Sequence, residues 1–150
     1  MEDDERGGRM PATCMTTVIF ACVHNAGRSQ MAAAFFNQLA DPARARALSA
    51  GTEPAAHVHP EVVAVMREIG IDLSTAHPTR LTEERAAGVQ LLVTMGCGAH
   101  CPVVPGIRRD NWELPDPKGQ SIERVRAIRD EIEARVRRLL AAEGWQRSAA

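Results

Sequence analysis

Five residues separate Cys22 from Arg28, and Ser29 follows directly. A segment this short can curl so that successive backbone N–H groups point at one centre, where they would bind a tetrahedral oxyanion. The planar guanidinium of Arg28 can pair two oxygens of that anion at once. The same positive groups favour the thiolate form of Cys22, which could attack the central atom of the anion. The spacing therefore predicts an anion loop with a nucleophile.

Each residue of this loop has an expected part. Gly27 would relieve the steric cost of an unusual backbone angle. Asn25 would hold the loop through side-chain hydrogen bonds, while His24 adds positive character or faces solvent. Ser29 could donate a hydrogen bond to the thiolate. The predicted anion-binding residues are Val23, His24, Asn25, Ala26, Gly27, Arg28 and Ser29. The alternative is a buried core cysteine and a solvated arginine.

The surrounding sequence supplies a strand, a loop and a helix in that order. The apolar run 17–21 precedes Cys22, and apolar residues recur at helical spacing from Ser29 to about residue 40. Further strands are predicted over 45–50, 89–95 and 107–114, with helices over 61–69, 81–87 and from Ser121 onward. Strands that alternate with helices predict a single α/β domain with a parallel sheet and helices on both faces. Ligands of such sheets bind beyond the carboxyl ends of the strands, where Cys22, Gly51, Cys97 and Asp116 all fall.

Length and composition narrow the classes of function. The 150 residues suit one domain, and a net charge of −1 gives no general attraction to nucleic acid or to an anionic membrane. The predicted divisions are a disordered tail over 1–15, the domain over 16–143 and a flexible C-terminus over 144–150. The tail has no apolar signal core, so a cytoplasmic protein is expected. In a cytoplasmic protein, the four cysteines of the chain indicate reduced thiols that are catalytic or bind a metal.

The string from Cys22 to Ala32, CVHNAGRSQMA, resembles the anion loop of the low-molecular-weight tyrosine phosphatase fold, and in particular the arsenate reductases built on it. The resemblance covers most of the chain. It implies a four-stranded parallel sheet, a cysteine nucleophile, and no bound cofactor or metal.

Asp116, between two prolines, is a candidate general acid that protonates the departing oxygen. An ordinary turn is the alternative. The family resemblance favours catalysis, because the family's Asp-Pro loop falls at the same place before the last helix. The chain departs from the phosphatases at Lys118, where they usually carry an aromatic residue, and it contains no tyrosine. Aromatic substrates would therefore lack a stacking surface.

Cys97 and Cys101 lie where redox members of the family keep the thiols that take electrons from the nucleophile. Their short spacing looks closer to forms that use mycothiol and mycoredoxin than to thioredoxin-coupled forms, so the reductant stays open. Two alternatives are inert loop cysteines and a metal site with His100, completed by His24 or Cys22.

The sequence thus predicts an arsenate reductase that forms an adduct on Cys22 and uses a second thiol. Arg28 clamps the anion, Asp116 is the acid, and Cys97 or Cys101 could resolve the adduct. A phosphatase acting on phosphomonoesters is the enzymatic alternative. A non-catalytic oxyanion-binding or redox-sensing module is the other.

Overall fold

The computed structural model describes residues 15–96 and 106–147. Four parallel strands form one sheet in the order β2-β1-β3-β4. The elements are β1 (Thr16–Cys22), α2 (Arg28–Leu39), β2 (Ala45–Gly51), α3 (Pro60–Arg67), α4 (Glu83–Ala86), β3 (Leu91–Thr94), β4 (Arg108–Asn111) and α5 (Ile122–Glu143). The predicted single α/β domain with a four-stranded parallel sheet is confirmed.

β1 lies inside the sheet and packs side chains on both of its faces. Val18 and Phe20 point toward the main core, and Ile19 and Ala21 point toward a smaller cluster on the opposite face. All four are fully buried. This explains the uninterrupted apolar run, because a strand covered on both faces needs no polar residue at alternate positions. β1 thus delivers its last residue, Cys22, to the carboxyl edge of the sheet.

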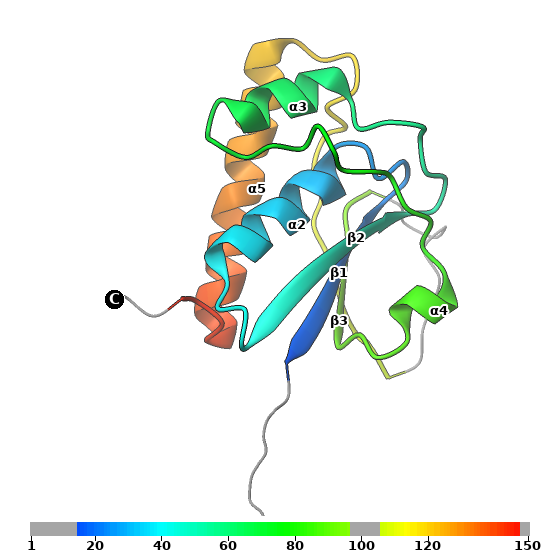
Figure 1. Cartoon of the computed structure of the whole chain (residues 1–150), viewed down its shortest axis with the longest axis vertical. Helices are drawn as coiled ribbons and strands as arrows, with labels where there is room; N and C mark the ends of the chain where they lie inside the picture. The colour runs from blue at the N-terminus through cyan, green and yellow to red at the C-terminus, as the bar shows by residue number, and fades with distance from the viewer. Residues whose placement is uncertain (1–14, 97–105, 148–150) are drawn as a thin grey trace, which may run out of the picture.

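Helices α2, α3 and α5 cover one face of the sheet, and α4 lies on the other (Figure 1). α4 is a single turn, shorter than the predicted helix over 81–87. Thr82 caps it by accepting a hydrogen bond from the backbone N–H of Arg85 at 3.1 Å. The fourth strand is also shorter than predicted, and its four residues are exposed at the sheet edge.

The end of the described chain packs on the domain. Gly144 ends α5 with a φ of 74°, a left-handed conformation that favours glycine. The ring of Trp145 then lies 6.0 Å from that of Phe36 in an edge-on contact, and its carbonyl accepts a hydrogen bond from Asp41 at 2.8 Å. Residues 144–147 are therefore held against α2, whereas the sequence predicts a flexible end from residue 144.

In the part of the chain that the structure describes, no helix is long and apolar enough to cross a membrane.

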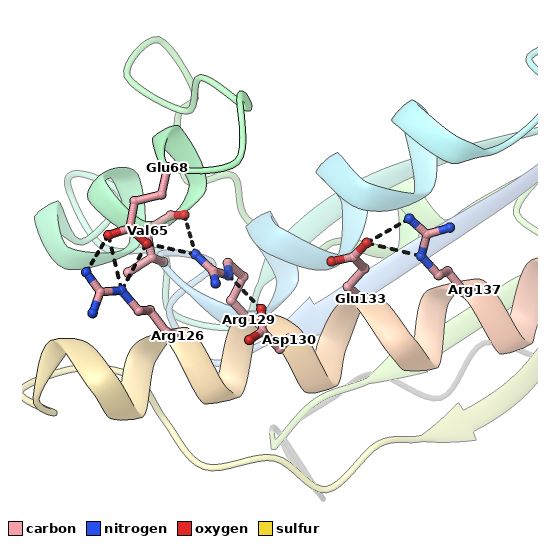
Figure 2. A network of polar contacts seen from close by, with 7 residues as sticks. All are labelled: Val65, Glu68, Arg126, Arg129, Asp130, Glu133 and Arg137. Atoms are coloured by element: carbon pink, nitrogen blue, oxygen red, sulfur yellow. Dashed lines mark hydrogen bonds and ion pairs between the residues drawn. The ribbon is translucent and has the colours of Figure 1, made fainter.

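An ionic network joins α3 to α5 (Figure 2). The carboxylate of Glu68 accepts hydrogen bonds from Arg126 at 2.6 Å and from Arg129 at 2.9 Å. Arg129, which is 8% exposed, also donates to the carbonyl of Val65 at 2.8 Å. The hydrogen bonds from Arg126 and Arg129 outweigh the opposing effect of burial and lower the pKa of Glu68 below its ordinary value.

This network should make the stability of the fold depend on pH. Because the pKa of Glu68 is lower in the folded state, the ionised carboxylate stabilises the fold above the ordinary value of 4.5. That contribution disappears as pH falls through the folded-state pKa. Glu68→Gln should therefore lower Tm at pH 7, by about 1–3 °C, and the difference from wild type should shrink below pH 4.5.

Thermal melts between pH 7 and pH 3 measure this difference. Glu133→Gln is the control, since it removes an exposed pair with Arg137 within α5 and should change Tm less. A Tm difference for Glu68→Gln that stays constant down to pH 3 would contradict the assigned role of its charge.

Candidate active site

The anion loop, residues 23–27, connects the end of β1 to the start of α2. Three of its carbonyls accept hydrogen bonds from a neighbouring segment: Val23 from Glu53 at 2.7 Å, His24 from Ala55 at 2.9 Å, and Ala26 from His59 at 2.9 Å. In a trans peptide the following N–H points opposite to the carbonyl. The N–H groups that follow these carbonyls therefore point to the inner side of the loop, as anion binding requires.

Cys22 lies at the base of this loop and is 2% exposed. Its Sγ is 2.8 Å from Ser29 Oγ, and it accepts a hydrogen bond from the backbone N–H of Asn25 at 3.2 Å. Hydrogen bonds to the charged form of an acid stabilise that form. The thiol is thus placed where polar groups can stabilise a thiolate.

Asn25 shapes the loop. Its φ of 51° lies in the left-handed region, which asparagine tolerates better than most residues. Its fully buried side chain donates to Ser29 Oγ at 2.7 Å and accepts from the backbone N–H of Thr79 at 2.8 Å. His24, in contrast, lies at the rim, where its ring contacts the carbonyl of Glu53 at 3.1 Å.

Arg28 begins α2 and is 8% exposed. Its Nη1 donates to the carbonyl of Leu114 at 3.0 Å, and its Nη2 lies 3.9 Å from Asp116 Oδ2. The fold therefore brings the two proposed catalytic groups together although they are far apart in the sequence. The Asp116 side chain is half-exposed, and its other oxygen accepts from the backbone of Lys118 at 3.0 Å.

Two glycines leave room for their neighbours at the site. Gly96 has a φ of 102°, and a Cβ there would collide with the guanidinium of Arg28. A Cβ on Gly51 would lie 2.6 Å from the carbonyl oxygen of Val23. The sequence leaves open whether Gly51 permits a close approach or belongs to an ordinary turn, and this contact supports the close approach.

Gly27 has a second role besides the one predicted. Its backbone angles, φ −144° and ψ −90°, lie outside the helical and extended regions. In addition, a Cβ on Gly27 would lie 2.7 Å from Pro117 Cγ. The missing side chain lets the Asp-Pro loop rest on the anion loop and keeps Asp116 beside Arg28.

Gly27→Ala should therefore push Pro117 away and displace Asp116. We expect kcat to fall about 10- to 100-fold, because a misplaced catalytic group loses most of its effect. Steady-state kinetics of the predicted arsenate reduction measure the change.

A double-mutant cycle separates this contact from general damage to the loop. Pro117→Ala removes the ring that the added methyl group would strike, so Gly27→Ala combined with Pro117→Ala should recover part of the lost activity. Strictly additive losses would show that the Gly27–Pro117 contact does not position Asp116.

Sequence reasoning missed three groups at the site: the Gln30 side chain, the backbone N–H of Thr79 and the carbonyl of Leu114. Gln30 is 6% exposed and contacts Asn25. The available signal was a glutamine directly before the apolar run 31–36 of this helix, because a buried amide needs partners. The two backbone groups left no signal in the sequence.

Cys97, Cys101 and His100 lie outside the described residues, so their arrangement relative to Cys22 stays a prediction. Within residues 15–96 and 106–147, no three His, Cys, Asp or Glu side chains gather as a metal site would require. A cavity of about 550 Å³ lies between β4 and α5. None of its lining residues belongs to the anion loop.

Comparisons with known proteins agree with this geometry. Residues 17–148 match the family model described as low molecular weight phosphotyrosine protein phosphatase. A putative arsenate reductase of Halobacterium salinarum is 42% identical over 133 residues, covering 85% of this chain and 92% of that protein. A glutaredoxin arsenate reductase of Synechocystis sp. is 36% identical, covering 85% of this chain and 98% of that protein.

A solved structure of a thioredoxin-dependent arsenate reductase of Corynebacterium glutamicum superposes with a TM-score of 0.74 at 38% identity. The match covers 85% of this chain and 61% of that longer chain. This chain therefore belongs to the low molecular weight phosphotyrosine protein phosphatase family. Within the family it groups with the arsenate reductases.

Proposed function

We propose that this chain reduces arsenate to arsenite with Cys22 as nucleophile. The observation that carries the proposal is the position of Cys22 Sγ at the base of the anion loop, 2.8 Å from Ser29 Oγ and 3.2 Å from the Asn25 N–H. The relatives named arsenate reductase support the choice of arsenate over other tetrahedral oxyanions.

The first step forms the covalent adduct. The inward N–H groups of the loop and the guanidinium of Arg28 bind the arsenate oxygens. The Cys22 thiolate attacks arsenic and forms a sulfur–arsenic bond. Asp116 protonates the departing oxygen, which leaves as water. The close approach of its neighbour Pro117 to Gly27 of the anion loop supports this role.

The second step reduces arsenic. Another thiolate attacks Cys22 Sγ and forms a disulfide, which breaks the sulfur–arsenic bond. The bonding electron pair stays on arsenic, so As(V) becomes As(III) while two thiols are oxidised. Arsenite is released, and an external thiol system must then reduce the disulfide.

The second thiol is Cys97 or Cys101 if the reductant is thioredoxin, or mycothiol itself if a mycoredoxin completes the cycle. A thioredoxin-dependent relative and a glutaredoxin arsenate reductase support thiol coupling in general. The chemistry requires reduced cysteines, which supports a cytoplasmic location.

Arsenite production by the purified protein tests the proposal. The reaction is supplied either with thioredoxin and its reductase or with mycothiol and mycoredoxin. Wild type is compared with Cys97→Ala and Cys101→Ala, and Cys14→Ala in the N-terminal segment is the control.

Turnover with thioredoxin that is lost in a Cys97 or Cys101 variant, but not in Cys14→Ala, would support an internal relay. Turnover only with mycothiol, unaffected by these variants, would leave Cys22 as the sole catalytic thiol of the chain. No arsenite with either system, together with steady hydrolysis of a phosphomonoester, would overturn the proposal in favour of a phosphatase.

A further inference from the structure

We infer that Gln30 is a positioning residue for the reaction: with the backbone N–H of Thr79, it fixes the orientation of the Asn25 amide and so leaves the Ser29 hydroxyl hydrogen available to Cys22. This inference rests on the proposed function, in which Cys22 is the nucleophile. Gln30 donates hydrogen bonds to Asn25 and His77 and does not contact Cys22. Its effect on Cys22 is indirect and passes through Asn25 and Ser29.

The orientation of the Gln30 amide follows from its partners. Its Nε2 lies 3.1 Å from the carbonyl oxygen of Asn25 and 3.3 Å from that of His77. A carbonyl can only accept, so the nitrogen of the Gln30 amide must face both. The same Nε2 lies 3.2 Å from the side-chain oxygen of Asn25.

The orientation of the Asn25 amide is set in turn. One of the two terminal atoms of the Asn25 side chain lies next to two donors, Gln30 Nε2 at 3.2 Å and the Thr79 N–H at 2.8 Å. Because both groups donate, that atom must be Oδ1. The opposite atom is then Nδ2, which faces Ser29 Oγ at 2.7 Å and donates to it.

The last contact of the series, between Ser29 Oγ and Cys22 Sγ, can then be donated by the serine. Ser29 Oγ accepts from Asn25, so its single hydrogen is free to point at Cys22 Sγ, 2.8 Å away. A serine that donates stabilises the thiolate, whereas a serine that accepts would stabilise the thiol. Gln30 and Thr79 thereby favour the reactive form of Cys22 without touching it.

The position of Gln30 in the fold suits this task. It lies in the first turn of α2, is 6% exposed, and ties that helix both to the anion loop and to the segment at His77. Methionine or leucine would satisfy packing at a buried helix position. The three hydrogen-bond acceptors around Nε2 explain why an amide stands there.

Gln30→Met tests the inference, because methionine has a similar length and cannot donate. The readout is the rate at which iodoacetamide alkylates Cys22, followed on its own peptide by mass spectrometry from pH 5 to pH 10. We expect alkylation about 3- to 10-fold slower than wild type below pH 7, with the difference between the two proteins narrowing toward pH 10.

Asn37→Leu is the matched control. Asn37 lies on the same helix and makes two hydrogen bonds to the backbone of Ala47, away from Cys22. The Asn37→Leu variant should have a lower Tm than wild type, but the pH profile of Cys22 alkylation should be unchanged. Gln30→Asn, a shorter amide, is a milder second variant and should shift the profile in the same direction as Gln30→Met.

The outcomes distinguish the inference from the proposed function. If both Gln30 variants lower Tm but keep the wild-type pH profile, Gln30 is only structural and the inference fails while Cys22 chemistry stands. If Cys22→Ser still reduces arsenate, the proposed function fails first. A shifted profile for the Gln30 variants with an inactive Cys22→Ser supports both.

Discussion

Cys22→Ser should abolish arsenate reduction while leaving the fold and anion binding intact. We expect turnover to fall by at least about 10⁴-fold, the order of loss seen when a covalent nucleophile is removed. A serine hydroxyl is close to a thiol in shape and can keep the hydrogen bonds with Ser29 and the Asn25 N–H. The groups that bind the anion, Arg28 and the loop N–H groups, are untouched.

Two measurements on the same protein check this expectation. Arsenite production reports catalysis, and calorimetric titration with inorganic phosphate reports occupation of the anion loop. Cys14→Ser is the control for loss of a thiol in the N-terminal segment, and it should match wild type in both. Turnover of Cys22→Ser above one-hundredth of the wild-type rate would contradict a covalent role for Cys22, and loss of phosphate binding would show that the loop itself has changed.

The anion loop could be predicted from sequence because its geometry is local. Five residues between Cys22 and Arg28, with a strand before and a helix after, leave few ways to close the chain. The two inner strands, β1 and β3, were predictable for a similar reason, since an apolar run is a pattern within a single element. β4 is polar and exposed and contains no such run.

The reasons behind individual residues were less predictable because they depend on distant segments. The sequence explains Gly27 by its own backbone angle, and the structure adds the contact with Pro117, which lies far along the chain. Trp145 falls in the predicted flexible end, yet it packs on Phe36. In both cases the deciding contact joins elements whose arrangement is set only by the folded sheet and helices.

Gln30 shows the same limit at the site. Its place in the sequence string is evident, but its function depends on which of its neighbours are carbonyls and which are N–H groups. That information belongs to the segment at 77–79, which carries no periodic pattern in the sequence. Hydrogen-bond direction is therefore a property of the assembled site.

Arg28→Lys should separate charge from geometry at the anion site. Arg28 Nη1 is held by the carbonyl of Leu114, and the close approach of Gly96 confines the guanidinium plane. The remaining N–H groups of the guanidinium can then donate hydrogen bonds to the anion from a fixed direction. A lysine keeps the positive charge, but its compact ammonium cannot bond Leu114 and pair two anion oxygens in the same geometry.

We expect kcat/KM for arsenate to fall about 10²- to 10³-fold in Arg28→Lys, by analogy with the loss of one preorganised donor to a developing charge. The loss should appear in both KM and kcat, since the fork binds the ground state and steadies the anion during attack. Steady-state kinetics at saturating reductant measure both constants. Arg137→Lys, an exposed arginine paired with Glu133 on α5, is the control and should leave them unchanged. Retention of more than one-tenth of wild-type kcat/KM in Arg28→Lys would mean that a positive charge suffices, and that the confinement of the guanidinium by Leu114 and Gly96 serves packing.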